Sequence, residues 1–247
     1  MKAARTIAAV AAGAALTLGA AGAAYADSAG ASPTASATSS TSGKTAGTAR
    51  LQTAKALASA RIQGRLATLH ALSLAVQDSR YLTSAERGTL STQIGSDLTG
   101  LSALATKMSD ETTVAAVRAD EAAMVDDYRV YMLMAPQTRL VDGAAAETDA
   151  AATLQKAYVA LQELLAKQPG GGTSQQQSEL ADLQSQITAA QAAIGNEVAT
   201  VLAIQPGPDA SSIEGALAPV KSAVKTARQD LVQARHDAKN LRDSLKS

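Results

Sequence analysis

Histidines and carboxylates are the residues of this sequence best suited to catalysis, but their spacing matches no catalytic pattern. The chain has no cysteine and two histidines, His70 and His236. A nucleophile–base pair needs Ser or Cys beside His, and no nucleophile-elbow signature surrounds either histidine. A helical di-metal site needs Glu three residues before His, where this chain has Ala67 and Gln233. We therefore predict that the protein is not an enzyme.

Cofactor and metal sites are not expected either. The sequence has no phosphate-binding P-loop and no dinucleotide fingerprint after a strand. Four carboxylates, Asp120, Glu121, Asp126 and Asp127, could hold a hard cation through oxygen ligands. On a regular helix they do not converge, so solvated or ion-paired carboxylates are favoured. The prediction is no metal and no cofactor.

The stretch YRVYMLMAPQ (128–137) holds two of the five tyrosines and two of the five methionines, in a chain without Phe or Trp. Because Pro136 disfavours helical geometry at Ala135, we expect a kink or corner there, where two helical segments meet, packed by these bulky side chains. Tyr81 is expected to join them. The alternative is a pocket for an apolar ligand or a partner helix, since Met-rich surfaces bind promiscuously. Its candidate residues are Tyr81, Tyr128, Tyr131, Met132 and Met134.

Apolar residues recur every three or four positions from Leu51 to Leu245, which is the period of amphipathic helices. The pattern predicts five helical segments, about 51–82, 84–108, 109–165, 174–201 and 213–245. Thr83–Glu86 and Ser174–Gln177 have the spacing of capping boxes. No alternation with a period of two predicts a strand. The expected fold is all-α: an elongated antiparallel helical bundle with coiled-coil-like packing.

The last segment carries the most regular apolar seam. Its gaps alternate between four and three from Ile213 to Leu245, which is a heptad pattern. Pro219 predicts either a helix start near that residue or a kink. Basic side chains follow one flank of the seam and form a candidate interaction surface. They are Lys221, Lys225, Arg228, Arg235, Lys239, Arg242 and Lys246.

Charge is divided along the chain. Residues 44–107 carry eight basic and three acidic side chains, residues 109–150 carry three and nine, and residues 219–247 carry seven and three. Exposed ion pairs contribute little singly, but charge patterns select partners. We expect the acidic middle segment to lie between its basic neighbours. Anionic wall polymers are the alternative partner for the basic flank.

The N-terminus predicts export. Lys2 and Arg5 precede an apolar run from Thr6 to Ala21 and an Ala24-Tyr25-Ala26 cleavage motif, so residues 1–26 have the pattern of a signal peptide for the general secretory route. A retained membrane anchor is the alternative. Residues 27–49 hold no large apolar side chain and predict a disordered Ser/Thr/Ala-rich linker, which would permit O-glycosylation. Residues 50–247 form the expected bundle domain, without a transmembrane segment.

Removal of residues 1–26 leaves 20 basic and 22 acidic side chains. This near-neutral balance argues against nucleic acid as a partner. The absence of cysteine excludes a disulfide framework.

The segment Asp127-Tyr128-Arg129-Val130-Tyr131, followed by Pro136 and Leu140-Val141, resembles a segment found in a group of uncharacterised exported helical proteins of actinobacteria. YLTSAERGTL (81–90), QIGSDLTGLSAL (93–104) and KTARQDLVQARHDAKNLR (225–242) are similar in layout, so the likeness covers most of residues 78–247. It implies a helical architecture and export, and it supplies no catalytic residues.

Two functions follow as hypotheses. The first is a secreted or envelope-associated, non-catalytic helical protein that acts through its surfaces on a protein or cell-envelope component. The second is a small-ligand-binding or sensory module that uses the Tyr/Met residues.

Overall fold

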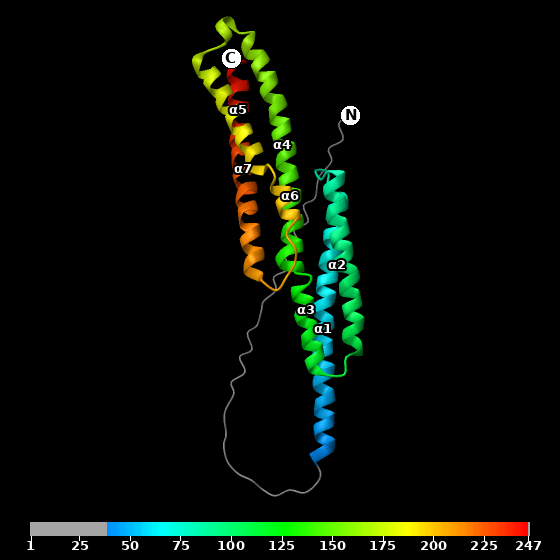
Figure 1. The fold of residues 1–247 in the computed structure, drawn as a ribbon. Coiled ribbons are helices and arrows are strands. Elements are labelled where there is room, and N and C mark those ends of the chain that lie inside the picture. The colour runs from blue at the N-terminus through cyan, green and yellow to red at the C-terminus, as the bar shows by residue number, and fades with distance from the viewer. Residues whose placement is uncertain (1–38, 247) are drawn as a thin grey trace, which may run out of the picture. The chain divides into compact units, whose positions relative to one another are not determined.

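The computed structural model describes residues 39–246, with side chains from Lys44, and every regular element in this range is helical. In chain order these are α1 (Ser39–Asp78), α2 (Ser84–Asp110), α3 (Val114–Asp126), a π-helical turn η1 (Val130–Met134), α4 (Ala135–Ala166), a 3-10 turn η2 (Pro169–Gly171), α5 (Ser174–Ile194), α6 (Glu197–Leu202) and α7 (Ala210–Ser244) (Figure 1). The all-α prediction is confirmed. The five predicted segments correspond to α1, α2, α3 with α4, α5 with α6, and α7.

Helix α1 begins at Ser39, inside the segment whose composition predicts disorder. The side chains of residues 44–50 are exposed, so this part of the helix buries none of them. Once a helix has nucleated, each further residue is added at little cost, which explains how an unpacked extension can form. The predicted signal peptide and residues 27–38 lie outside the described residues.

Helices α1 and α2 form an antiparallel hairpin. The Lys55 ammonium donates to the Ser109 carbonyl at 2.7 Å, and the Arg87 guanidinium donates to the Gln77 carbonyl at 3.0 Å. The predicted capping box at the start of α2 is confirmed: the Glu86 amide donates to the Thr83 hydroxyl, and the Thr83 amide donates to the Glu86 carboxylate. Helix α2 extends to Asp110, so α3 starts later than expected, at Val114.

The expected corner between two helical segments is present, between α3 and α4, but it lies at Arg129 and its expected position at Ala135 and Pro136 is wrong. Arg129 has a left-handed backbone (φ 42°, ψ 39°), whereas Ala135 is helical (φ −69°, ψ −46°). The Ala135 amide bonds to the Val130 carbonyl, five residues back. A π turn is wider than an α turn, so the proline ring clashes less with the preceding carbonyl.

Helices α4, α5 and α7 pack along one another (Figure 1). Helix α5 runs antiparallel to α7, because Gln176 donates to Ser244 while Gln186, ten residues on, donates to Asp237 at 2.8 Å. Helix α4 runs parallel to α7.

The second of these directions follows from two contacts. Gly143 lies against Val224, and four residues further along both helices the Arg228 guanidinium donates to the Glu147 carboxylate at 2.6 Å. The α4–α7 pair is therefore in parallel register.

The heptad seam of α7 faces the core. Leu245 is partly buried, and the other seam residues are buried: Ile213, Leu217, Val220, Val224, Ala227, Leu231, Ala234, Ala238 and Leu241. Helix α7 starts at Ala210, after the Asp209 cap, with Pro219 inside it, so a start near Pro219 is wrong. Burial of Ile213 and Leu217 offsets the hydrogen bond that the proline cannot make.

Glycines correct the two boundaries of α5. Gly172 has φ 86°, which places the capping box on Thr173 and Gln176, one residue before the predicted pair. Gly195 has φ 29° and ends the helix at Ile194, so the expected single helix through Val201 is two, α5 and α6. Glycine is the residue that most readily ends a helix in this way.

Candidate functional site

A hollow of about 680 Å³ forms an open groove between α4 and α7, bordered by Tyr81 of the α1–α2 turn. We call it the α4–α7 groove. It is lined by Tyr81, Ala146, Asp149, Ala150, Thr153, Leu154, Ala157, Ala160, Leu161, Leu164, Arg235, Ala238, Lys239 and Arg242. Its floor is built of small and aliphatic side chains, and its rim is charged.

The floor of this groove is a second seam on α4. The lining positions 146, 150, 153, 157, 160 and 164 are separated by alternating gaps of four and three. Thr153, Ala160 and Leu164 on this seam are exposed, Leu164 to 46%. A heptad stripe on a helix is the surface that receives another helix, and small side chains permit a close approach.

The rim of the groove is basic along α7. Arg235, Lys239 and Arg242 are exposed, and the Asp243 carboxylate contacts both Lys239, at 3.2 Å, and Arg242, at 2.9 Å. Within residues 39–246, Arg235 forms no ion pair. The α7 rim therefore keeps a net positive charge.

Tyr81 and Asp149 line the groove beside the α1–α2 turn. The Arg80 guanidinium lies 4.7 Å from the centre of the Tyr81 ring, in a cation–π contact. Its hydrogen bond to the Tyr81 hydroxyl, with a smaller contribution from Asp149, raises the pKa of Arg80. The turn is tied to α4 by a hydrogen bond from the Ser79 hydroxyl to Asp142.

A smaller hollow of about 260 Å³, the corner pocket, lies where α2 meets the α3–α4 corner and the α6–α7 loop. It is lined by Gln93, Ser96, Asp97, Asp127, Tyr128, Leu133, Met134, Gln137, Ile204, Gln205 and Pro206. No Lys, Arg or His is among these residues, whereas two carboxylates are.

Two oxygen atoms of the corner pocket are buried without a protein donor: Gln93 Oε1 and Asp97 Oδ2. Burial raises the pKa of Asp97 to about 6. Burial, with smaller contributions from Asp127 and Asp97, also raises the pKa of Tyr128. Buried acceptors without donors are rare in folded proteins, and each calls for an explanation.

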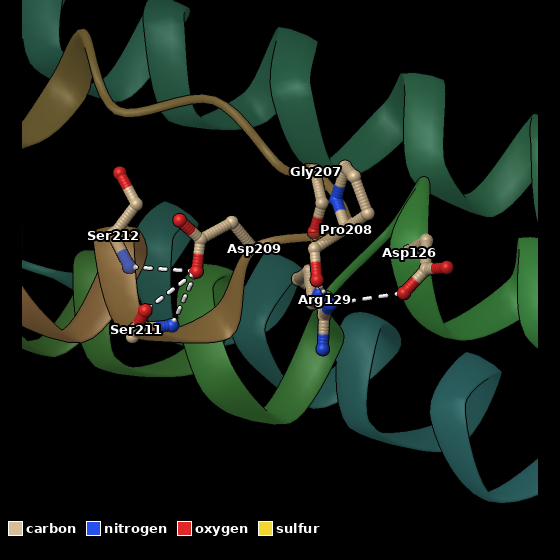
Figure 2. A network of polar contacts seen from close by, with 7 residues as sticks. All are labelled: Asp126, Arg129, Gly207, Pro208, Asp209, Ser211 and Ser212. Carbon is tan, nitrogen blue, oxygen red and sulfur yellow. Dashed lines mark hydrogen bonds and ion pairs between the residues drawn. The ribbon is translucent and has the colours of Figure 1, made fainter.

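Figure 2 shows the polar network that builds the corner beside this pocket. The Arg129 side chain is 9% exposed and donates to the Gly207 carbonyl at 2.8 Å, to the Pro208 carbonyl at 2.6 Å and to Asp126 at 2.9 Å. Asp209 caps α7, and hydrogen bonds from the Ser211 hydroxyl and the backbone amides that follow lower its pKa. The Arg129 side chain thus connects the break between α3 and α4, where its own backbone is left-handed, to the α6–α7 loop.

The structure separates the five Tyr/Met residues that the sequence groups into one pocket. Tyr81 lines the α4–α7 groove, while Tyr128 and Met134 line the corner pocket. Tyr131 and Met132 line a third hollow of about 370 Å³ beside Pro136. The Tyr131 ring is 55% exposed and lies 5.2 Å from the Arg65 guanidinium.

The seven residues of the predicted basic surface are all exposed, but they face different surroundings. Arg235, Lys239 and Arg242 line the α4–α7 groove, and Lys221 lines the third hollow. Arg228 binds Glu147. Lys225 and Lys246 line none of these hollows.

Three of the four clustered carboxylates form ion pairs, as expected. Asp120 pairs with Lys107, Glu121 with Arg61 and Asp126 with Arg129, while Asp127 is exposed at the corner pocket. The pairs of Asp120 and Glu121, like that of Glu147, connect the acidic segment to a basic neighbour, which is the arrangement that the charge pattern predicts.

The α4 seam is present in the sequence, but it is hard to recognise there, because Ala and Thr are common throughout this alanine-rich chain.

Within residues 39–246, no three His, Asp or Glu side chains are grouped to hold a metal ion, and none of the helices described there has the length and apolarity needed to cross a membrane. We found no matching family model, no matching curated protein and no matching solved structure.

Proposed function

We propose that this chain is an exported, non-catalytic helical protein whose α4–α7 groove binds an acidic amphipathic helix of a partner protein. The observation that carries the proposal is the second heptad seam of α4, on which Thr153, Ala160 and Leu164 are exposed. The composition of residues 1–26 supports export.

The shape of the groove favours a helix over a small molecule. The α4 seam runs from Ala146 to Leu164, which corresponds to about 27 Å of helix. Its exposed positions leave the floor open along its length, whereas small-molecule sites enclose most of the ligand. A helix laid on Ala146, Ala150, Ala157 and Ala160 would approach closely and convert three packed helices into four.

The charge of the groove selects an acidic partner. Arg235, Lys239 and Arg242 lie at spacings of four and three on α7, so acidic side chains at the same spacing on a docked helix would meet them. Reversal of such charges typically alters specificity and association rate more than the fold. The partner is therefore a helix with small or Leu side chains on one face and Glu or Asp on its flank.

A synthetic helical peptide tests this proposal. We would titrate the full chain with a labelled peptide of about 20 residues that has Ala and Leu at its seam and Glu on its flanks, and follow fluorescence anisotropy. The matched control peptide has Lys in place of Glu. We expect saturable binding of the acidic peptide only.

Variants locate the binding. Arg235→Glu with Lys239→Glu should weaken binding at least about tenfold, whereas Lys225→Glu with Lys246→Glu, on the same flank outside the groove, should leave it within about twofold. Equal binding of both peptides, or equal loss in both double variants, would refute the proposal. Sedimentation showing a dimer that Arg235→Glu and Lys239→Glu dissociate would assign the groove to a second copy of the chain instead.

A further inference from the structure

We propose that the corner pocket binds a small organic cation, a primary alkylamine, whose ammonium group donates to Asp97 and Gln93. This inference is independent of the proposed function, because the pocket shares no lining residue with the α4–α7 groove.

The first argument is the forced orientation of Gln93. Its Nε2 donates to the Leu202 carbonyl at 3.2 Å, so its Oε1 must point the other way, where it is buried without a protein donor. Asp97 lies four residues later on α2 and therefore on the same helix face. Its Oδ2 is likewise buried without a protein donor. A ligand that donates more than one hydrogen bond, as an ammonium group does, would satisfy both of these acceptors on the same helix face.

The second argument is charge. Asp97 and Asp127 are the only charged side chains that line the pocket. The guanidinium of Arg129, at the same corner, is directed to Asp126 and to two loop carbonyls (Figure 2). Burial of a carboxylate without a cation beside it raises the free energy of the folded state, and a bound cationic ligand would lower it.

The third argument is the apolar remainder of the wall. Leu133, Met134, Ile204 and Pro206 line the pocket beside the half-buried Tyr128 ring. A volume of about 260 Å³ far exceeds the roughly 30 Å³ that one water takes up in the liquid. A short alkyl chain would contact these side chains while its ammonium reaches the two oxygens. A hard metal ion would need six or more oxygen ligands, whereas only two of the lining side chains are carboxylates.

A titration of the full chain with butylammonium chloride tests the site. The side-chain amide signals of Gln93 and Gln137 would be followed by ¹H–¹⁵N NMR at pH 7.5, with sodium and potassium chloride at equal ionic strength as controls. We expect saturable shifts with butylammonium only. The same saturable shifts with either inorganic ion, or no saturable shift, would overturn the proposal.

Two comparisons assign the binding to Asp97. Asp97→Asn keeps the shape and removes the charge, and should weaken binding at least about tenfold. Asp110→Asn changes an exposed carboxylate on the same helix and should have no effect.

The titratable groups that line the pocket are Asp97, Asp127 and Tyr128; η1, α4 and the α6–α7 loop contribute none. Because the pKa of Asp97 is about 6, binding at pH 5 should be about tenfold weaker than at pH 7.5. Unchanged affinity in Asp97→Asn would refute the assignment, as would unchanged affinity at pH 5.

Discussion

At the scale of single residues, Asp97 gives this fold a pH dependence opposite to that of an ion-paired carboxylate. Burial raises its pKa from 3.8 to about 6, so between these values the folded state binds more protons than the unfolded state. The contribution of this group to the free energy of unfolding therefore falls as the pH rises through that window, and is lowest above pH 6.

Asp97→Asn should accordingly stabilise the ligand-free protein at pH 7.5. We expect a gain of roughly 1 kcal/mol, discounted for the partial exposure of the side chain, and a much smaller gain at pH 4, where Asp97 is already protonated in the folded protein. Urea denaturation of both proteins at pH 4, 5.5 and 7.5 measures this. A difference that is independent of pH would contradict it.

Arg129 combines backbone strain with buried side-chain bonds, and its variants separate the two. Among the described residues it is the only non-glycine with a positive φ. Arg129→Ala keeps the strain and removes the three hydrogen bonds, so we expect a loss of about 2–4 kcal/mol. Arg129→Gly relieves the strain and should recover about 1 kcal/mol of that loss. Thermal and urea unfolding rank the three proteins, and a Gly variant as stable as the parent would show that the side-chain bonds contribute no more than the strain that glycine relieves.

At the scale of elements, helix α2 shows how one glycine is required for packing and another is not. Gly100 lies under Tyr128, and a Cβ at this position would be 2.5 Å from the tyrosine oxygen. Gly95, on the same helix, is exposed, and a Cβ there would meet nothing within 4 Å.

Gly95→Ala should stabilise the protein by about 0.5–1 kcal/mol, because alanine favours the helix. Gly100→Ala should instead destabilise it by about 1–3 kcal/mol, because the Tyr128 ring must move. The test is the change in unfolding free energy of each variant, with tyrosine fluorescence reporting the ring. Equal stabilisation by both substitutions would show that Tyr128 moves away without cost.

Helix α7 offers a matched pair of neighbouring residues. Leu231 is 2% exposed in the core and Val232 is 60% exposed. Leu231→Ala should cost about 2–5 kcal/mol, and Val232→Ala less than about 0.5 kcal/mol. Urea denaturation distinguishes them, and similar losses would place the α7 seam elsewhere.

At the scale of the whole molecule, the charge pattern concerns which helices pair, and the N-terminal residues concern export. The ion pairs of Arg61, Lys107 and Arg228 join the acidic segment to helices on either side in the sequence. Each of these pairs has one exposed partner, so its contribution to the free energy of unfolding is small. The pairs act mainly by selecting which helices lie side by side.

Export is the prediction at this scale. Expressed in a Gram-positive secretory host, the protein should appear in the medium with Asp27 as its first residue, because Ala24 and Ala26 provide the small side chains that signal peptidase needs. N-terminal sequencing measures this, and Ala24→Arg should block processing. Cytosolic protein that keeps Met1 would contradict it.

Features that depend on residues three or four positions apart could be predicted from the sequence. These are the all-α class, the Thr83 capping box, the seam of α7 and the ends at proline- and glycine-rich turns, because helical hydrogen bonds and faces are local. Even here, the glycines at 172 and 195 shifted boundaries that the apolar period alone placed differently.

The three-dimensional structure was needed to establish which helices meet, and therefore where the candidate sites lie. It showed the helix break at Arg129, whose guanidinium donates to two carbonyls that lie 78 and 79 residues further along the chain. It separated Tyr81 from Tyr128, left the alanine seam of α4 open beyond the α1–α2 turn, and buried Asp97 without a cation. No local pattern encodes these outcomes, because each depends on side chains brought together from distant parts of the chain.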